Sequence, residues 1–227
     1  MRNVLIVVGF LLFFIPATGQ ATYRTGYLPS FNLNQKFLAK WALNYKIEGR
    51  AIASIGSFEN PNSYQFDYSL TDISILGSQK IGLNNKLAAG YLLRLSEAAP
   101  RHRLIQQYTI VKRYSGWRLA HRIASDQTFG AGESTTIRLR YRLSTDLPLN
   151  GQSVDEQELY FKINHEYLTA FEQNQTDLEI RLIPYLGYLI NEQNKVEMGL
   201  DYRLNRLLQN RPNRHTLWLA LNWFVSI

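Results

Sequence analysis

The sequence His215-Thr-Leu-Trp-Leu-Ala-Leu-Asn-Trp-Phe-Val-Ser-Ile227 decides the fold class of this chain. Successive side chains of an extended strand point to opposite faces. Such a strand has one entirely apolar face, formed by Leu217, Leu219, Leu221, Trp223, Val225 and Ile227. A last strand of this kind needs lipid or a partner protein to cover it, and the strands that end outer-membrane barrels have this character.

Residues 1–19 have the pattern of a secretory signal peptide. Arg2 gives a positive start, residues 4–15 form an apolar run, and Ala17-Thr18-Gly19 offers small residues at the cleavage spacing. We expect the mature chain to begin at Gln20. The run is shorter than the about 20 apolar residues that a membrane-spanning helix needs, so we expect any membrane span to be made of strands. The sequence has no cysteine, which excludes disulfides, thiolate metal sites and a lipoprotein signal.

Period-two alternation of apolar and polar residues recurs along the chain. In residues 40–50, apolar side chains occupy one face, and the other face carries Asn44, Lys46, Glu48 and Arg50. Similar divisions are found in residues 86–95, 117–128, 137–143, 159–167, 178–182 and 196–204. Alternating segments separated by turn residues are typical of a transmembrane barrel. The composition agrees, because 45% of the residues are hydrophobic while the mean hydropathy is −0.24.

We therefore predict an all-β protein, an antiparallel transmembrane β-barrel of about ten strands over residues 36–227. Eight or twelve strands remain alternatives, and residues 20–35 form either a plug or an added strand. An even number of strands would bring both ends of the chain to the periplasmic side. A shift in alternation near Thr71 or Asp72 predicts a β-bulge.

The connections between the predicted strands alternate in length. Short turns at residues 83–85, 114–116 and 191–194 suit the periplasmic side, where barrel turns are short. The longer stretches 54–63 and 130–134 are then expected outside. Residues 147–156 are long for a periplasmic turn.

Several segments, in this order, resemble an uncharacterised family of bacterial outer-membrane barrel proteins, domain-of-unknown-function family 2490. The resemblance covers most of the mature chain, and it implies a β-barrel in the outer membrane of a Gram-negative bacterium without a known activity. Ile227 departs from the Phe that commonly ends such barrels. The segments that carry the resemblance are Trp41-Ala-Leu-Asn-Tyr-Lys-Ile-Glu-Gly-Arg50, His121-Arg-Ile-Ala-Ser-Asp-Gln-Thr-Phe129, Arg138-Leu-Arg-Tyr-Arg-Leu143, Phe161-Lys-Ile-Asn-His-Glu-Tyr167 and Asn194-Lys-Val-Glu-Met-Gly-Leu-Asp-Tyr-Arg203.

If the apolar faces meet lipid, a set of charged residues lines the lumen. Arginine suits a network of this kind, because its planar guanidinium stays ionised and pairs bidentately with carboxylates. A barrel of this size leaves little room for a continuous water column, so we expect the charges to pair across strands and fill the interior. The predicted lumen set consists of Glu48, Arg50, Arg94, Arg118, Arg122, Asp126, Arg138, Arg140, Arg142, Lys162, Glu166, Glu179, Arg181, Glu197, Asp201 and Arg203.

Three other functions are open at this point. The lumen set leans positive, and rings of Arg and Lys favour anions, so a narrow anion-favouring channel is the first alternative. A lipid-modifying hydrolase is the second, with His121, Ser125 and Asp126 as the best local cluster and His165 beside Glu166 as the next. Both clusters fit poorly, since alternation points their members to opposite faces. A soluble periplasmic carrier of the lipocalin type is the third, and it would turn its apolar face inward.

The expected role is thus structural or binding, without catalytic, cofactor or metal residues. The net charge of +7 could suggest nucleic acid, but no nucleic-acid-binding motif is present, and anionic lipopolysaccharide is the better partner for a barrel. We expect a monomer in the outer membrane that contacts lipid and lipopolysaccharide and is inserted by the barrel assembly machinery.

Overall fold

The computed structural model of the chain describes residues 21–59 and 64–227, apart from the side chain of Gln65. The predicted signal peptide, residues 1–19, lies outside the described residues. The described part is built from strands joined by turns and loops. Within it, no helix has the length and apolar character needed to cross a membrane.

The fold is made of strands of 11 to 17 residues. Tilted strands of this length are long enough to cross a bilayer. Their bounds are β1 Thr22–Leu38, β2 Trp41–Ser57, β3 Tyr64–Lys80, β4 Asn85–Leu95, β5 Arg101–Tyr114, β6 Trp117–Gly130, β7 Thr136–Pro148, β8 Glu158–Glu172, β9 Gln175–Asn191, β10 Asn194–Asn205 and β11 Arg214–Ser226.

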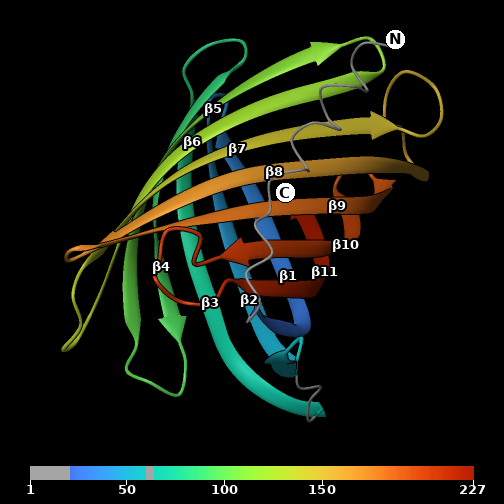
Figure 1. Ribbon diagram of the computed structural model, residues 1–227. Helices are drawn as coiled ribbons and strands as arrows, with labels where there is room; N and C mark the ends of the chain where they lie inside the picture. The colour runs from blue at the N-terminus through green and yellow to red at the C-terminus, as the bar shows by residue number, and fades with distance from the viewer. Residues whose placement is uncertain (1–20, 60–63) are drawn as a thin grey trace.

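The strands form one closed barrel in which each strand pairs with its neighbour in the chain, and β1 pairs with β11 to close the ring (Figure 1). The ten strands predicted over residues 36–227 correspond to β2–β11. The eleventh, β1, comes from the N-terminal segment, and the structure makes that segment an added strand rather than a plug. The prediction of a wholly antiparallel barrel is wrong at one place, because β1 and β11 run parallel, with Thr22 beside Arg214 and Asn34 beside Ser226.

The parallel pair places the described chain ends at opposite rims of the barrel. We call the rim where β1 and β11 begin the N-terminal rim, and the rim where they end the C-terminal rim. The predicted meeting of both ends on one side is therefore wrong, because the added strand makes the number odd. The short turns 83–85, 114–116 and 191–194 do share the C-terminal rim with Ile227, and the loop 130–134 lies at the N-terminal rim.

The bulge predicted near Thr71 or Asp72 lies slightly earlier in β3. Arg50 pairs with Leu70, whereas the next residue of β2, Ala51, pairs with Tyr68. Ser69 is thus the extra residue. The shift restores the alternation, so that Asp72 points into the barrel and is buried.

The outer wall of the barrel is apolar and the inner wall is charged. Leu217, Leu219, Leu221 and Trp223 of β11 are 39% to 53% exposed, although such residues would be buried in a soluble domain. The largest side chains that are fully buried are instead carboxylates, Glu166 among them. The apolar face of every alternating segment therefore points away from the interior.

A smaller apolar cluster fills part of the interior beside β1 and β11. It contains Leu28, Ile183, Tyr185, Trp218 and Ala220. The ring of Trp218 lies against Gly26 of the neighbouring strand, where a Cβ would collide with it. Rings lie over glycines in the same way at Tyr185 with Gly199 and at Tyr160 with Gly187. Glycine leaves the space that these rings occupy on the inner wall.

Candidate functional site

Three arginines of β7 form the centre of a charge cluster in the barrel. Arg138, Arg140 and Arg142 are two residues apart, so all three point inward. Asp126 of β6 pairs in register with Arg138, and Glu166 of β8 pairs in register with Arg142. We call these three arginines and two carboxylates the arginine wall. Asp126 and Glu166 are both 0% exposed.

Asp126 binds guanidinium groups from two neighbouring strands. Its Oδ1 lies 2.5 Å from Nη2 of Arg138, and its Oδ2 lies 2.7 Å from Nη2 of Arg140. Arg103 of β5 approaches Oδ1 to 3.5 Å from the other side. A carboxylate buried to this degree keeps its charge only because cations surround it.

Glu166 holds the other half of the arginine wall. Its Oε2 accepts a hydrogen bond of 2.5 Å from Nε of Arg142, and its Oε1 lies 3.0 Å from Nη1 of Arg181 on β9. Arg140 lies 3.9 Å away and so connects Glu166 to Asp126. The network therefore runs without a break from β5 to β9 across the inner surface.

A second cluster joins β2, β3 and β4. Glu48 is 2.5 Å from Nζ of Lys46 and 2.8 Å from Nη2 of Arg50. Arg94 donates two hydrogen bonds of 2.7 Å to the two oxygens of Asp72, which is the bidentate geometry that favours arginine. Arg50 lies 3.6 Å from Asp72 and links the two halves.

Glu197 of β10 is the centre of a third cluster, toward the C-terminal rim. Both of its oxygens accept hydrogen bonds of 3.0 Å from Nζ of Lys162, and Tyr160 donates one of 2.7 Å. Lys195 adds a contact of 3.5 Å. Glu197 is almost fully buried, so lysine and tyrosine together replace its water.

Two short pairs complete the interior network. Arg203 donates hydrogen bonds of 2.9 Å and 2.6 Å to the two oxygens of Asp201. Arg181 donates from Nε to Glu179, so it joins Glu179 to Glu166. Interior carboxylates are thus met by cations on their own strand, on an adjacent strand or, for Glu197 and Lys162, on the next strand but one.

The structure brings most of the predicted lumen set together. Every member except Arg122 makes an ion pair with another described residue. Arg118 pairs with Asp146, and its side chain is 43% exposed. Arg122 lies in register with Arg142, a like charge, and has no carboxylate within ion-pair distance in the described residues.

Sequence reasoning missed five charged members of these clusters. Lys46 lies on the same face of its strand as Glu48, so the alternation already indicated that it points inward. Asp72 follows the bulge, Arg103 lies in a run whose facing the sequence left ambiguous, and Asp146 and Lys195 lie beyond the ends of clear alternation. The missed residues are Lys46, Asp72, Arg103, Asp146 and Lys195.

An internal cavity of about 360 Å³ remains between these clusters. Its charged lining is strongly unbalanced. The lining cations are Arg24, Lys46, Arg50, Arg94, Arg103, Arg138, Arg140, Arg142, Arg181, Arg203 and Arg214, and the lining carboxylates are Glu48, Asp72, Glu179 and Asp201. The cavity can therefore attract small anions, because cations in a low-dielectric enclosure focus the field.

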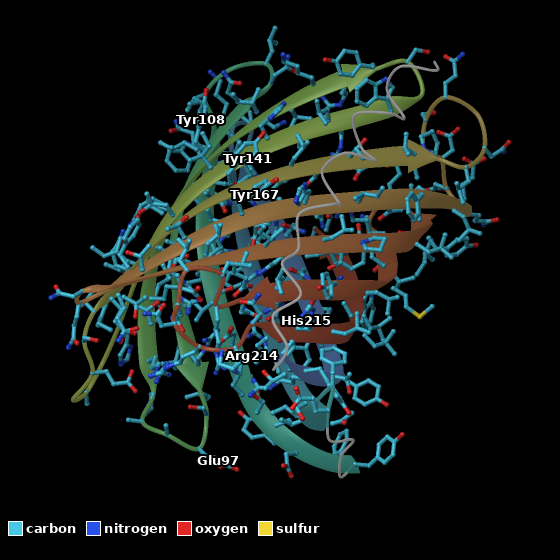
Figure 2. The ribbon with its side chains drawn as sticks, in the orientation of Figure 1. Glu97, Tyr108, Tyr141, Tyr167, Arg214 and His215 are labelled. Atoms are coloured by element: carbon cyan, nitrogen blue, oxygen red, sulfur yellow. The ribbon has the colours of Figure 1, made fainter. Side chains whose placement is uncertain are left out.

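The histidine clusters considered for hydrolysis are divided by the barrel wall. His121 lies outside, where its Nδ1 is 2.8 Å from the hydroxyl of Tyr141, whereas Asp126 is buried inside. His165 packs on the ring of Tyr167, with centroids 4.7 Å apart. In Figure 2 Tyr108, Tyr141 and Tyr167 mark a row across β5, β7 and β8 on this outer side. In each cluster the carboxylate, Asp126 or Glu166, thus points to the other side of the wall from the histidine.

No group of three or more His, Cys, Asp or Glu side chains suited to a metal ion occurs within residues 21–59 and 64–227.

The fold and interior define a class of protein, a closed β-barrel with an apolar outer wall and a charged interior joined by ion pairs. Residues 22–223 match a family described as "Protein of unknown function (DUF2490)", and the chain belongs to that family. This agrees with the resemblance seen in the sequence, although the description names no location or activity. No curated protein and no solved structure matches the chain.

Proposed function

We propose that this protein is an outer-membrane β-barrel whose interior is closed by ion pairs, with a structural or binding role rather than a catalytic one. Its outer wall contacts lipid and lipopolysaccharide, and the barrel assembly machinery inserts it. It works as a monomer, because closure of the barrel leaves no sheet edge for a second copy to extend.

The outer wall supports the membrane location. Aliphatic and aromatic side chains stay exposed on every strand, although Gln106, Ser125 and Gln127 form a polar group on the outer face of β5 and β6. An extensive apolar surface of this kind is rare on soluble monomers and marks contact with lipid or a partner. Neighbouring strands are hydrogen-bonded all around the ring, as a spanning structure requires.

The single observation that best supports a closed interior is the burial of Asp126 and Glu166. Both are fully buried, and each is bridged to guanidinium groups from adjacent strands. A wide aqueous channel would leave these carboxylates in contact with water. Their burial and the rings over glycine favour an interior filled by side chains.

Single-channel recording tests this proposal. The folded protein, identified by its shifted gel mobility before boiling, is placed in a planar bilayer under a salt gradient. We expect no steady conductance. Steady current from demonstrably folded protein would contradict the closed interior.

The cavity favours a narrow anion channel as the second candidate. Its lining holds many more cations than carboxylates, and basic pores select anions. The same recording decides between the two functions. Steady conductance that prefers chloride over potassium, and that falls in Arg140→Gln, would establish the channel.

A further inference from the structure

Four buried polar atoms at the parallel pair of strands have no hydrogen-bond partner among the described residues. We call the parallel pair of β1 and β11 the seam. The four atoms are Oγ1 of Thr22, Nε of Arg24, Nε of Arg214 and Nε1 of Trp218. Other buried atoms without a hydrogen bond belong mostly to residues that are already in ion pairs, such as Arg138, Arg140 and Glu166. Arg24 and Arg214 have no ion pair with a described residue, and buried donors are almost always satisfied in folded proteins, so the seam group indicates a missing partner.

The register of the seam brings these residues into one patch. Arg24 lies directly beside Thr216, Thr22 beside Arg214, and Gly26 beside Trp218. All point inward, since they are two residues apart on each strand. Arg24, Arg214 and Trp218 also line the cavity described above, and Figure 2 shows where Arg214 lies on β11 near the N-terminal rim.

Trp218 is the deepest member of the patch. It is only 3% exposed, and its ring is fixed against Gly26 and the apolar cluster. The ring therefore cannot turn outward, and a partner for its indole N–H must come from the cavity that Trp218 lines. Tryptophan is a donor only, so the group that satisfies it must be an acceptor.

The arginines of the patch differ from those of the arginine wall in having no carboxylate within ion-pair distance. Neither Arg24 nor Arg214 makes an ion pair with a described residue, and Arg206, in the loop between β10 and β11, adds a third positive charge that repels both. The local carboxylates are already engaged. Glu179 accepts from Arg181 and Asn205, and Asp177 accepts the backbone N–H of Arg206 at 3.2 Å.

We propose that the seam binds a phosphate-type dianion, held by Arg24, Arg214 and the indole N–H of Trp218. A tetrahedral oxyanion has several acceptor oxygens in different directions, so it can satisfy donors from two strands at once. It also neutralises the repulsion between guanidinium groups. The ligand is free phosphate or the phosphate of a small soluble molecule, because the site is inside the barrel and not on the lipid-facing wall. The site is formed by inward-pointing side chains, so the inference does not depend on the proposed membrane location.

Isothermal titration calorimetry of the folded protein in detergent, at constant ionic strength, tests the site. The probes are inorganic phosphate and glycerol 3-phosphate, with acetate and chloride as monoanion comparisons. We expect saturable binding of both phosphates. Binding of phosphate alone identifies the free ion as the ligand, and equal or tighter binding of the ester identifies a phosphorylated molecule.

Three variants and one control locate the binding. Arg24→Gln and Arg214→Gln should each raise the Kd for phosphate by about tenfold or more, because each removes a charge-assisted contact. Trp218→Phe keeps the ring and removes the N–H, and it should raise the Kd about three- to tenfold. Arg211→Gln removes the same charge from an exposed position in the loop before β11 and should leave the Kd unchanged.

Several results would overturn the assignment. Heat that never saturates, acetate or chloride binding as tightly as phosphate, or equal losses in Arg24→Gln and Arg211→Gln would each show general charge attraction rather than a site. Gel mobility of every variant shows that it is folded. A protein that binds phosphate and also conducts ions would contradict the closed interior while leaving the seam site in place.

Discussion

The arginine wall and the seam are both inner surfaces rich in arginine, but they differ in how the arginine charge is neutralised. In the wall, Arg138 and Arg142 meet fully buried carboxylates at 2.5 Å. In the seam, Arg24 and Arg214 have no carboxylate within ion-pair distance among the described residues, and their Nε atoms have no hydrogen-bond partner. Arg138 Nη2, Arg140 Nε and Glu166 Oε1 of the wall also have none, but each lies 2.5 to 3.9 Å from an opposite charge. Arginine content alone therefore does not tell a structural network from a binding surface. The distinction lies in the carboxylates that accompany it.

Glu166→Gln should have the largest effect on stability. The change leaves Arg142 and Arg181 without their shared carboxylate, and removal of one partner of a buried ion pair costs about 3–5 kcal/mol. Urea unfolding in lipid vesicles measures the loss. Glu97→Gln, in an exposed loop at the N-terminal rim (Figure 2), is the matched control and should change little. A loss below about 1 kcal/mol would mean that water reaches the arginine wall.

Leu219→Arg should cause the next largest loss of stability. It tests whether the outer face of the seam resembles the outer face of the rest of the barrel. Leu219 is exposed on β11, and an arginine facing lipid at the bilayer midplane costs about 2–4 kcal/mol. The same unfolding measurement applies. Leu83→Arg, in a fully exposed turn, is the control. A neutral result at Leu219 would contradict the lipid-facing assignment.

Arg24→Gln should have the opposite sign from Glu166→Gln. Without phosphate in the buffer, the change removes repulsion from Arg206 and Arg214, and it should stabilise the protein by up to about 1 kcal/mol. Unfolding midpoints in phosphate-free chloride buffer give the value. A clear loss of stability would show that Arg24 is paired like the arginines of the wall, and the comparison between the two regions would fail.

Glu133→Gln should have the smallest effect. Glu133 pairs with Arg101 at 2.6 Å in the loop region of the N-terminal rim, and both side chains are 40% exposed. Exposed pairs of this kind contribute about 0.5 kcal/mol or less. The difference should vanish in about 1 M salt, where the Debye length is about 3 Å. A loss as large as that of Glu166→Gln would mean that burial does not set the strength of these pairs.

Much of the barrel could be predicted because its main signal is local. Side-chain alternation is fixed by strand geometry, so the outward-facing apolar residues of β11 and the inward arginines of β7 follow from two-residue spacing. The same rule puts His121 and Asp126 on opposite faces of their strand, and the barrel wall does divide them. The bulge was found within a few residues because it reverses that alternation.

The remaining features depend on pairing between strands, which alternation does not encode. The parallel register of β1 with β11 joins segments that are far apart in sequence, and nothing in residues 20–35 shows which edge they extend. The partner of each arginine depends on register, so Asp72 and Arg103 were missed. The seam patch was missed for the same reason, since Arg24 and Arg214 become neighbours only when the ring closes.

The parallel seam also sets the order in which the chain can fold. The antiparallel neighbours are joined by turns or loops and can form as hairpins, whereas the contact between Ser30 and Asn222 bridges 192 positions. Closing so large a loop carries the greatest entropic cost, and contacts of high sequence separation slow folding. The edge of β1 that faces β11 therefore stays unpaired until β11 has formed. The two strands that hold the unpaired arginines are also those whose pairing completes the molecule.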